Sequence, residues 1–380
     1  MKTFAEINER LLTAEEVIPL VKEKGPEAVA REVDVVTTAT FGPMCSSGVF
    51  LNFGHSDPPI RMTRVWLNDV PAYGGIAAVD AYLGATELSE TRGMDYGGAH
   101  VIEDLLAGKP VRLRAVSYGT DCYPRREIET TVDLARLNQA ILFNPRNAYQ
   151  NYPVAVNGSG RTIYTYMGTL LPHFGNATYS TAGELSPLLN DPFYRTIGVG
   201  TRIFLGGAVG YVAWEGTQHN PAQNRAENGV PVSLAGTLAL IGNLKEMNRR
   251  YLRAAIFDRY GVSIYVGIGV PIPILDEEMA AFVGVSNAEI RTTIVDYGVP
   301  RRARPTYGQV TYAELRSGEI ELKGRKVPTA PLSSLAMARE IARILKEWLQ
   351  SGRFLLQEPI RPLPLEGRMN PLEEEEGVYV

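Results

Sequence analysis

The chain of 380 residues contains two cysteines, Cys45 in the segment FGPMCSSGVF and Cys122 in the segment YGTDCYPRRE. A cysteine thiolate is a strong nucleophile that can form a disulfide or ligate a metal ion. Small residues follow Cys45 and leave its thiol approachable. Cys122 lies between an aspartate, which raises a thiol pKa, and two arginines, which lower it, so the direction of the shift stays open. The sequence therefore allows three interpretations: two inert thiols, a structural bridge, or two halves of a reaction.

Other polar residues near the cysteines could bind a small charged molecule. His55 lies in the irregular segment FGHSDPP, close to Cys45 in the sequence, whereas His100, His173 and His219 match no zinc-binding spacing. An arginine can bind a carboxylate through two parallel hydrogen bonds, although most arginines are simply surface residues. A zwitterionic molecule would find both signs of charge among the candidates Asp57, Arg61, Arg125, Arg126 and Arg202. No metal site is predicted.

The glycine-rich segment GVGTRIFLGGAVGY begins at Gly198 and resembles a nucleotide-binding loop only at first sight. Ile203 stands where the third glycine of G-x-G-x-x-G should be, and no G-K-[ST] is present. Glycines of this kind more often mark bulges or close backbone approaches within strands. We therefore predict strands here and no cofactor.

Composition narrows the class of protein. The net charge is −4 and the pI is near 5.8, which argues against a nucleic-acid partner. No apolar run reaches the length of a membrane helix, and the acidic N-terminus does not resemble a signal peptide. We expect a cytoplasmic protein without a membrane partner. Because cytosolic disulfides are more often transient than structural, this location favours a catalytic role for the cysteines.

Hydrophobic periodicity predicts both helices and strands. Thr13 and Glu16 form a capping box at the start of a helix, strands are predicted at 32–42 and 110–119, and an amphipathic helix is predicted at 236–257. Ser333 or Ser334 begins a C-terminal helix that Gly352 ends.

These elements predict an α+β fold: a mixed-sheet enzyme body with glycine-rich loops and a C-terminal helix. We expect one catalytic body over residues 1–355, with a division into two subdomains near residue 150 left open. Residues 356–380 are expected to form a Pro-rich, acidic arm.

Three segments, TATFGPMCSSGVFLNFGHSDPPIRM, YGTDCYPRRE and GVGTRIFLGGAVGYVAWEGTQHNP, resemble the family of homocysteine biosynthesis enzymes of the sulfur-incorporation type. The resemblance covers about residues 10 to 360. It implies a sulfurtransferase that converts L-aspartate semialdehyde to homocysteine. Family members commonly carry a C-terminal pair of CBS domains, which the printed residues lack, so we expect no regulation through such domains.

The resemblance also implies roles for individual residues. The two family cysteines correspond to Cys45 and Cys122, and a cysteine persulfide delivers sulfur to the aldehyde. Cys122 is expected to carry the persulfide because its arginines favour an anion, and Cys45 is expected to resolve it by thiol–disulfide exchange. His55 would protonate the carbonyl oxygen, while Asp57 and Arg61 would hold the amino and carboxylate groups.

The implied partners are a sulfide or persulfide donor and a ferredoxin-type protein that supplies two electrons. No tightly bound cofactor is predicted, and we expect a homo-oligomer. The runner-up hypothesis is an iron–sulfur or metal-dependent lyase or hydratase acting on a small carboxylic acid. Since a cluster needs four thiolates, it would be shared with other ligands or a second subunit. A third hypothesis is a non-catalytic assembly protein with inert thiols.

Overall fold

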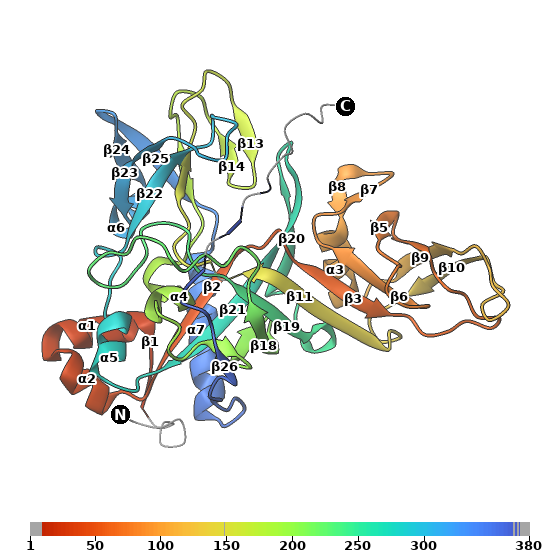
Figure 1. The fold of residues 1–380 in the computed structure, drawn as a ribbon, viewed down its shortest axis with the longest axis horizontal. Coiled ribbons are helices and arrows are strands. Elements are labelled where there is room, and N and C mark those ends of the chain that lie inside the picture. The colour runs from red at the N-terminus through yellow and green to blue at the C-terminus, as the bar shows by residue number, and fades with distance from the viewer. Residues whose placement is uncertain (1–9, 148, 368, 371, 373–380) are drawn as a thin grey trace.

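The structure is a computed structural model that describes residues 10–147, 149–367, 369, 370 and 372. Its fold is α+β, as the sequence predicts, with helices packed around mixed sheets (Figure 1). None of the described helices offers an apolar stretch of membrane-crossing length. The helices are α1 (Ala14–Lys24), α2 (Pro26–Glu32), α3 (Gly98–Leu106), α4 (Pro187–Asn190), α5 (Glu277–Val283), α6 (Tyr312–Arg316) and α7 (Leu335–Gln350).

A 10-stranded sheet forms the centre of the described structure. Its longest strand, β21 (Gly261–Pro273), is almost entirely buried and pairs with neighbouring strands along both edges. The strand order is β1 (Leu11–Thr13), β2 (Val35–Pro43), β21 (Gly261–Pro273), β17 (Arg202–Leu205), β18 (Ala208–Glu215), β19 (Leu238–Asn243), β11 (Gln139–Asn147), β3 (Gly48–Asn52) and β6 (Asp80–Gly84), while β20 (Leu252–Phe257) pairs with β21.

Smaller sheets flank this centre on two sides (Figure 1). A four-stranded sheet has the order β10 (Glu127–Val132), β9 (Val111–Val116), β4 (Arg64–Leu67) and β5 (Val70–Ala72). A six-stranded sheet has the order β23 (Thr306–Thr311), β22 (Arg291–Asp296), β12 (Val154–Val156), β15 (Ala177–Tyr179), β25 (Arg325–Pro331) and β24 (Glu319–Leu322). The two-stranded sheets are β7 (Leu88–Ser89) with β8 (Gly93–Gly97), β13 (Ile163–Thr165) with β14 (Gly168–Leu170), and β16 (Gly198–Val199) with β26 (Arg361–Pro362).

The predicted C-terminal helix is confirmed as α7, which packs across β21 and begins at the Ser334 cap. Glycines on β21 allow the close contact. A Cβ atom added at Gly267 would lie 2.8 Å from Ile341 Cδ1, and one at Gly269 would lie 3.0 Å from Ile341 Cγ2. Larger residues there would push the helix away from the sheet.

Two further predictions from local sequence are confirmed. Thr13 and Glu16 form both halves of the capping box of α1. The glycine-rich segment forms the β17–β18 hairpin, whose turn residues Gly206 and Gly207 have φ angles of 60° and 96°. Only glycine adopts such angles at little cost, which explains the two adjacent glycines of this turn.

The predicted helix at 236–257 is wrong. The structure has β19, a single 3₁₀ turn at Leu244–Glu246 and β20 in its place. Most of β19 is buried, so its near-continuous apolar run mimics the helical spacing. Asn243 ends the strand, and its side chain accepts a hydrogen bond from the backbone N–H of Lys245. The turn that begins at Asn243 therefore divides this segment into two strands, although its apolar residues recur at helical spacing.

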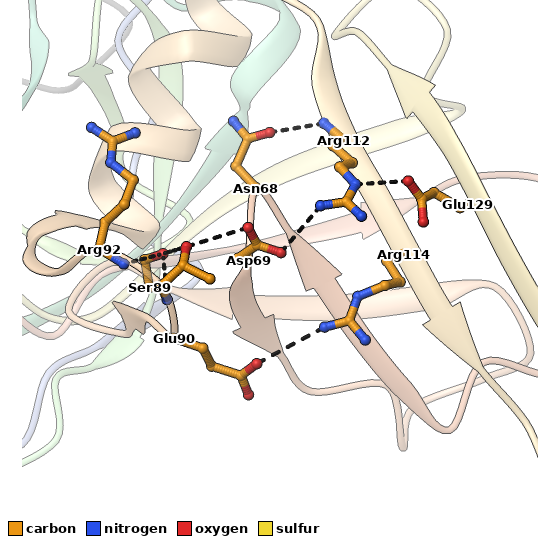
Figure 2. Close-up of polar contacts among 9 residues, drawn as sticks. Asn68, Asp69, Ser89, Glu90, Arg92, Arg112, Arg114 and Glu129 are labelled. Atoms are coloured by element: carbon orange, nitrogen blue, oxygen red, sulfur yellow. Dashed lines mark hydrogen bonds and ion pairs between the residues drawn. The ribbon is translucent and has the colours of Figure 1, made fainter.

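A polar network fixes the β7–β8 hairpin against the four-stranded sheet (Figure 2). The turn between β4 and β5 holds Asp69, whose carboxylate accepts a hydrogen bond from Thr91 at 3.3 Å and faces Arg112 at 3.5 Å. The Asp69 carbonyl oxygen also accepts from the backbone N–H of Glu90 at 2.9 Å. Arg114 on β9 approaches the Glu90 carboxylate at 3.9 Å. The hairpin is thereby connected to the β4–β5 turn and to strand β9 of the flanking sheet.

The first residues of the predicted C-terminal arm pack on the body. β26 pairs with β16, and Leu363 is buried. His219 Nε2 lies 2.9 Å from the carbonyl oxygen of Pro364. Residues 373–380 of the arm lie outside the described residues. The division into a body over 1–355 and an arm stays a prediction.

Replacing Leu345 by alanine tests the packing of α7 on the central sheet. Leu345 is fully buried, so Leu345→Ala should lower the free energy of unfolding by about 2–5 kcal/mol. Arg343→Ala on the exposed face of the same helix is the control and should cost at most about 1 kcal/mol. The midpoints of urea unfolding measure both effects, and equal midpoints for the two variants would contradict the packing.

Candidate active site

Cys45 lies in the turn that follows β2, beside the start of β21. Strand pairing aligns Pro43 with Tyr265, and the Met44 backbone N–H continues the ladder by donating to Ile264 O at 2.8 Å. Ser47 closes the turn by donating to the Met44 carbonyl oxygen. The turn places Cys45 Sγ 3.1 Å from Ser263 Oγ.

The Cys45 thiol opens into a cavity of about 370 Å³. We call it the tyrosine cavity, because tyrosines make up much of its wall. Its lining consists of Pro43, Cys45, Ser46, Arg146, Tyr149, Tyr152, Tyr166, Met167, Ser180, Gln218 and Tyr260. The cavity thus joins a nucleophile, one cation and several hydroxyl groups.

Arg146 supplies the positive charge of the tyrosine cavity. It lies near the end of β11, where a β-bulge interrupts the pairing between Asn144 and Asn147. The guanidinium donates hydrogen bonds to Ser46 Oγ from Nε at 3.3 Å and from Nη2 at 3.1 Å. No carboxylate of the described residues forms an ion pair with Arg146. Its charge is therefore available for an anionic ligand.

The hydroxyl groups of Tyr149 and Tyr260 in the cavity stay protonated at neutral pH. Burial raises the pKa of Tyr149 to about 12 and that of Tyr260 to about 12. The Tyr152 and Tyr149 rings meet edge to face at 5.0 Å, which holds both in place. A neutral phenol donates a hydrogen bond, so these groups can stabilise a developing oxyanion.

Opposing effects act on the Cys45 thiol. Burial raises its pKa above the usual value, while the hydrogen bond with Ser263, the backbone N–H of Cys45 and the charge of Arg146 act to lower it. Burial is the largest contribution, so the resting group at neutral pH is the thiol. The reactivity of the Cys45 thiol therefore depends on Ser263 and Arg146, which favour the thiolate.

Most of the other predicted site residues lie around the loop that carries Cys122 and do not line the tyrosine cavity. The loop that carries Cys122 packs on the segment after β3, where the Tyr123 and His55 rings stack at 6.1 Å. Arg125 Nη2 donates to the Asp57 carbonyl oxygen at 2.9 Å. Arg61 Nη1 lies 3.5 Å from the hydroxyl of Tyr118 in the same loop. Arg126 is exposed on this loop as well.

The two cysteines are free thiols separated by the length of β3. Cys45 precedes this strand, and the exposed Cys122 lies in the loop that contacts residues beyond its end. A strand of five residues spans about 13 Å, so the fold holds the two loops apart. A direct exchange between the thiols requires one loop to move.

Arg202 lies in neither group. It begins β17, which pairs with β21 at Ile268 and Gly269, whereas Cys45 contacts Ser263 near the other end of β21. Among the described residues, no three His, Cys, Asp or Glu side chains gather as metal ligands would.

Sequence reasoning missed Arg146 and the tyrosines. The segment FNPRNAYQNYP carries Arg146, Tyr149 and Tyr152 at a spacing of three residues, from the end of β11 into the loop that follows it. A loop that follows a strand commonly carries functional side chains, and this spacing was the available signal.

Removing the Ser263 hydroxyl tests its effect on the thiol. Because this hydrogen bond lowers the pKa of Cys45, Ser263→Ala should raise that pKa further. Alkylation by iodoacetamide requires the thiolate, so the pH midpoint of Cys45 labelling should move upward. Mass spectrometry separates this labelling from that of Cys122, whose midpoint is the internal control. An unchanged Cys45 midpoint would contradict the contact.

Comparisons with known proteins identify the family to which the chain belongs. The family described as homocysteine biosynthesis enzyme, sulfur-incorporation, matches residues 10–356. The L-aspartate semialdehyde sulfurtransferase of Methanosarcina acetivorans is 55% identical over 99% of this chain and 75% of its own length. The enzyme of that name from Methanocaldococcus jannaschii is 51% identical over 96% of this chain and 73% of its own length. No solved structure matches significantly. The chain belongs to the sulfur-incorporating family of homocysteine biosynthesis enzymes.

Proposed function

We propose that the chain converts L-aspartate semialdehyde to homocysteine, with sulfur delivered from Cys45 inside the tyrosine cavity. The observation that carries this proposal is the presence of a nucleophilic thiol and the Arg146 guanidinium in the wall of one cavity. The names of the two relatives support the substrate and the reaction class. Overall, an aldehyde, one persulfide sulfur, four electrons and four protons give a thiol and water, and the carrier thiol is regenerated.

Arg146 binds the substrate carboxylate in this proposal. A guanidinium matches a carboxylate through two parallel hydrogen bonds, and the described residues leave it without a competing carboxylate. The faces of the surrounding tyrosine rings accept the substrate ammonium through cation–π contacts. Both ends of the amino acid are then fixed, and the aldehyde points to the thiol.

Cys45 carries the sulfur as a persulfide, whose terminal atom attacks the aldehyde carbon. Tyr149 or Tyr260 donates a hydrogen bond to the carbonyl oxygen as it gains charge, in place of the distant His55. The adduct is Cys45–S–S–CH(OH)–R. Two electrons and two protons cleave its S–S bond, which restores the Cys45 thiol and releases HS–CH(OH)–R.

Loss of water from HS–CH(OH)–R leaves a thioaldehyde, and two further electrons and two protons give the thiol. Sulfur supplied at the persulfide level therefore needs four electrons, whereas sulfide needs two. An external reductant provides these electrons, and a ferredoxin-type protein in the cytoplasm suits this role.

We assign the sulfur to Cys45 because Cys45 is among the described residues that line the cavity, whereas the sequence-based expectation was Cys122. Cys45→Ser should lower homocysteine formation by at least about 10³-fold, since serine holds no sulfane sulfur. Cys122→Ser should retain most activity when a chemical reductant is supplied. Homocysteine is measured by derivatisation and chromatography under anaerobic conditions. An equal loss in both variants would support obligatory exchange between the two thiols instead.

Arg146→Gln tests the carboxylate anchor. Losing a charged hydrogen-bond pair should raise KM for the aldehyde about 10- to 100-fold, with Arg146→Lys in between. The matched control is Arg253→Gln, which removes a surface guanidinium paired with Glu103 and should leave KM unchanged. Steady-state kinetics measure these values, and a normal KM in Arg146→Gln would exclude the anchor.

A further inference from the structure

Cys45 borders a second cavity on its other side. This cavity, of about 440 Å³, is lined by Cys45, Ser46, Thr86, Leu88, Tyr260, Gly261 and Val262. We call it the Leu88 cavity. Cys45, Ser46 and Tyr260 line both cavities, so they form the partition between them.

The two cavities face different parts of the fold. Tyr166, in the turn of the β13–β14 hairpin, lines the tyrosine cavity, whereas Leu88, in the β7–β8 hairpin, lines the Leu88 cavity. Figure 1 shows these two hairpins on opposite sides of the hairpin formed by β20 and β21. The thiol is therefore accessible from two directions.

The linings also differ in charge. Arg146 lines the tyrosine cavity, but the lining of the Leu88 cavity contains no charged side chain. Its lining combines Leu88, Val262 and Gly261 with the uncharged polar groups of Ser46, Thr86, Tyr260 and Cys45. Such a wall favours an uncharged molecule over a carboxylate, because a desolvated anion would find no counter-charge there.

We propose that the Leu88 cavity is the sulfur-loading site, where an uncharged hydropersulfide transfers its terminal sulfur to Cys45. This inference rests on the proposed function, which has Cys45 deliver sulfur. It adds a separate binding site for the sulfur donor, on the side of the thiol away from the aldehyde.

The loading step balances without an added oxidant. The Cys45 thiolate attacks the terminal sulfur of a donor R′–S–SH, the donor S–S bond breaks, and a new S–S bond forms on Cys45. The products are Cys45–S–SH and the thiolate R′–S⁻, which takes up the proton that Cys45 released. Ser263 and Arg146 favour the attacking thiolate, as their effect on the pKa of Cys45 indicates.

The persulfide can serve both cavities by rotation. Its terminal sulfur lies about 2 Å from Sγ, so rotation about the side-chain bonds of Cys45 moves this atom from one side of the partition to the other. The hydrogen bond with Ser263 at 3.1 Å holds Sγ near the pivot. Sulfur loaded from the Leu88 cavity then meets the aldehyde in the tyrosine cavity.

Thr86→Trp tests this assignment, since Thr86 is exposed and a larger side chain there should fill the cavity without disturbing the core. Loading is followed by mass spectrometry of Cys45 after mixing with 2-hydroxyethyl hydropersulfide at a mildly acidic pH, where more of this donor is in its uncharged, electrophilic form. Discharge is followed separately after adding the aldehyde and a reductant to the loaded protein. The variant should load about tenfold more slowly and discharge at the normal rate.

Three controls define the comparison. Met94→Trp places the same side chain at an exposed position on β8, outside the cavity lining, and should load normally. Arg146→Gln should impair discharge more than loading. Saturating L-homoserine, which has the carboxylate and amino groups of the substrate, should occupy the tyrosine cavity and leave loading within about twofold of normal.

The inference is overturned if Thr86→Trp and Leu88→Phe both load normally, or if they slow discharge as much as loading. Complete inhibition of loading by L-homoserine would also overturn it, because donor and substrate would then share one cavity. Failure of the proposed function looks different: wild-type protein would form no persulfide on Cys45, or a loaded protein would give no homocysteine.

Discussion

The register between β2 and β21 determines the site. It aligns Pro43 with Tyr265, so that the turn after β2 lies beside Ser263 and the thiol of Cys45 meets a hydroxyl group. A shift of one residue would turn every side chain of β2 to the opposite face. Burial on both faces of β21, together with the glycines that accept α7, makes such a shift costly. The position of the nucleophile is thus a consequence of core packing.

Burial has two opposite consequences for this nucleophile. It protects the thiol from solvent and raises its pKa, which weakens it at neutral pH. The same low-polarity surroundings strengthen the hydrogen bonds and charges that remain, including those from Ser263 and Arg146. Protonated tyrosines add donors without adding negative charge. The cavity therefore suits an anion bound at one end and an oxyanion that forms at the other.

Local signals in the sequence were sufficient for some elements and not for others. The caps of α1 and α7 and the glycine turn of the β17–β18 hairpin were predictable because each depends on neighbouring residues. The helix predicted at 236–257 failed because a buried strand and a helix can share one apolar spacing. Cys45 was recognisable by its chemistry. Its partners were not, since Arg146, Tyr166 and Tyr260 come from segments far apart in the chain.

The hairpins on either side of Cys45 belong to separate sheets and share no residue. The polar network around Asp69 holds one of them against the four-stranded sheet (Figure 2), independently of the other. Substitutions in one hairpin can therefore accumulate without forcing changes in its counterpart. In the proposed mechanism, one hairpin borders the aldehyde site and the other borders the sulfur-loading site. Aldehyde specificity and sulfur-donor specificity can then change independently, during evolution or by protein engineering.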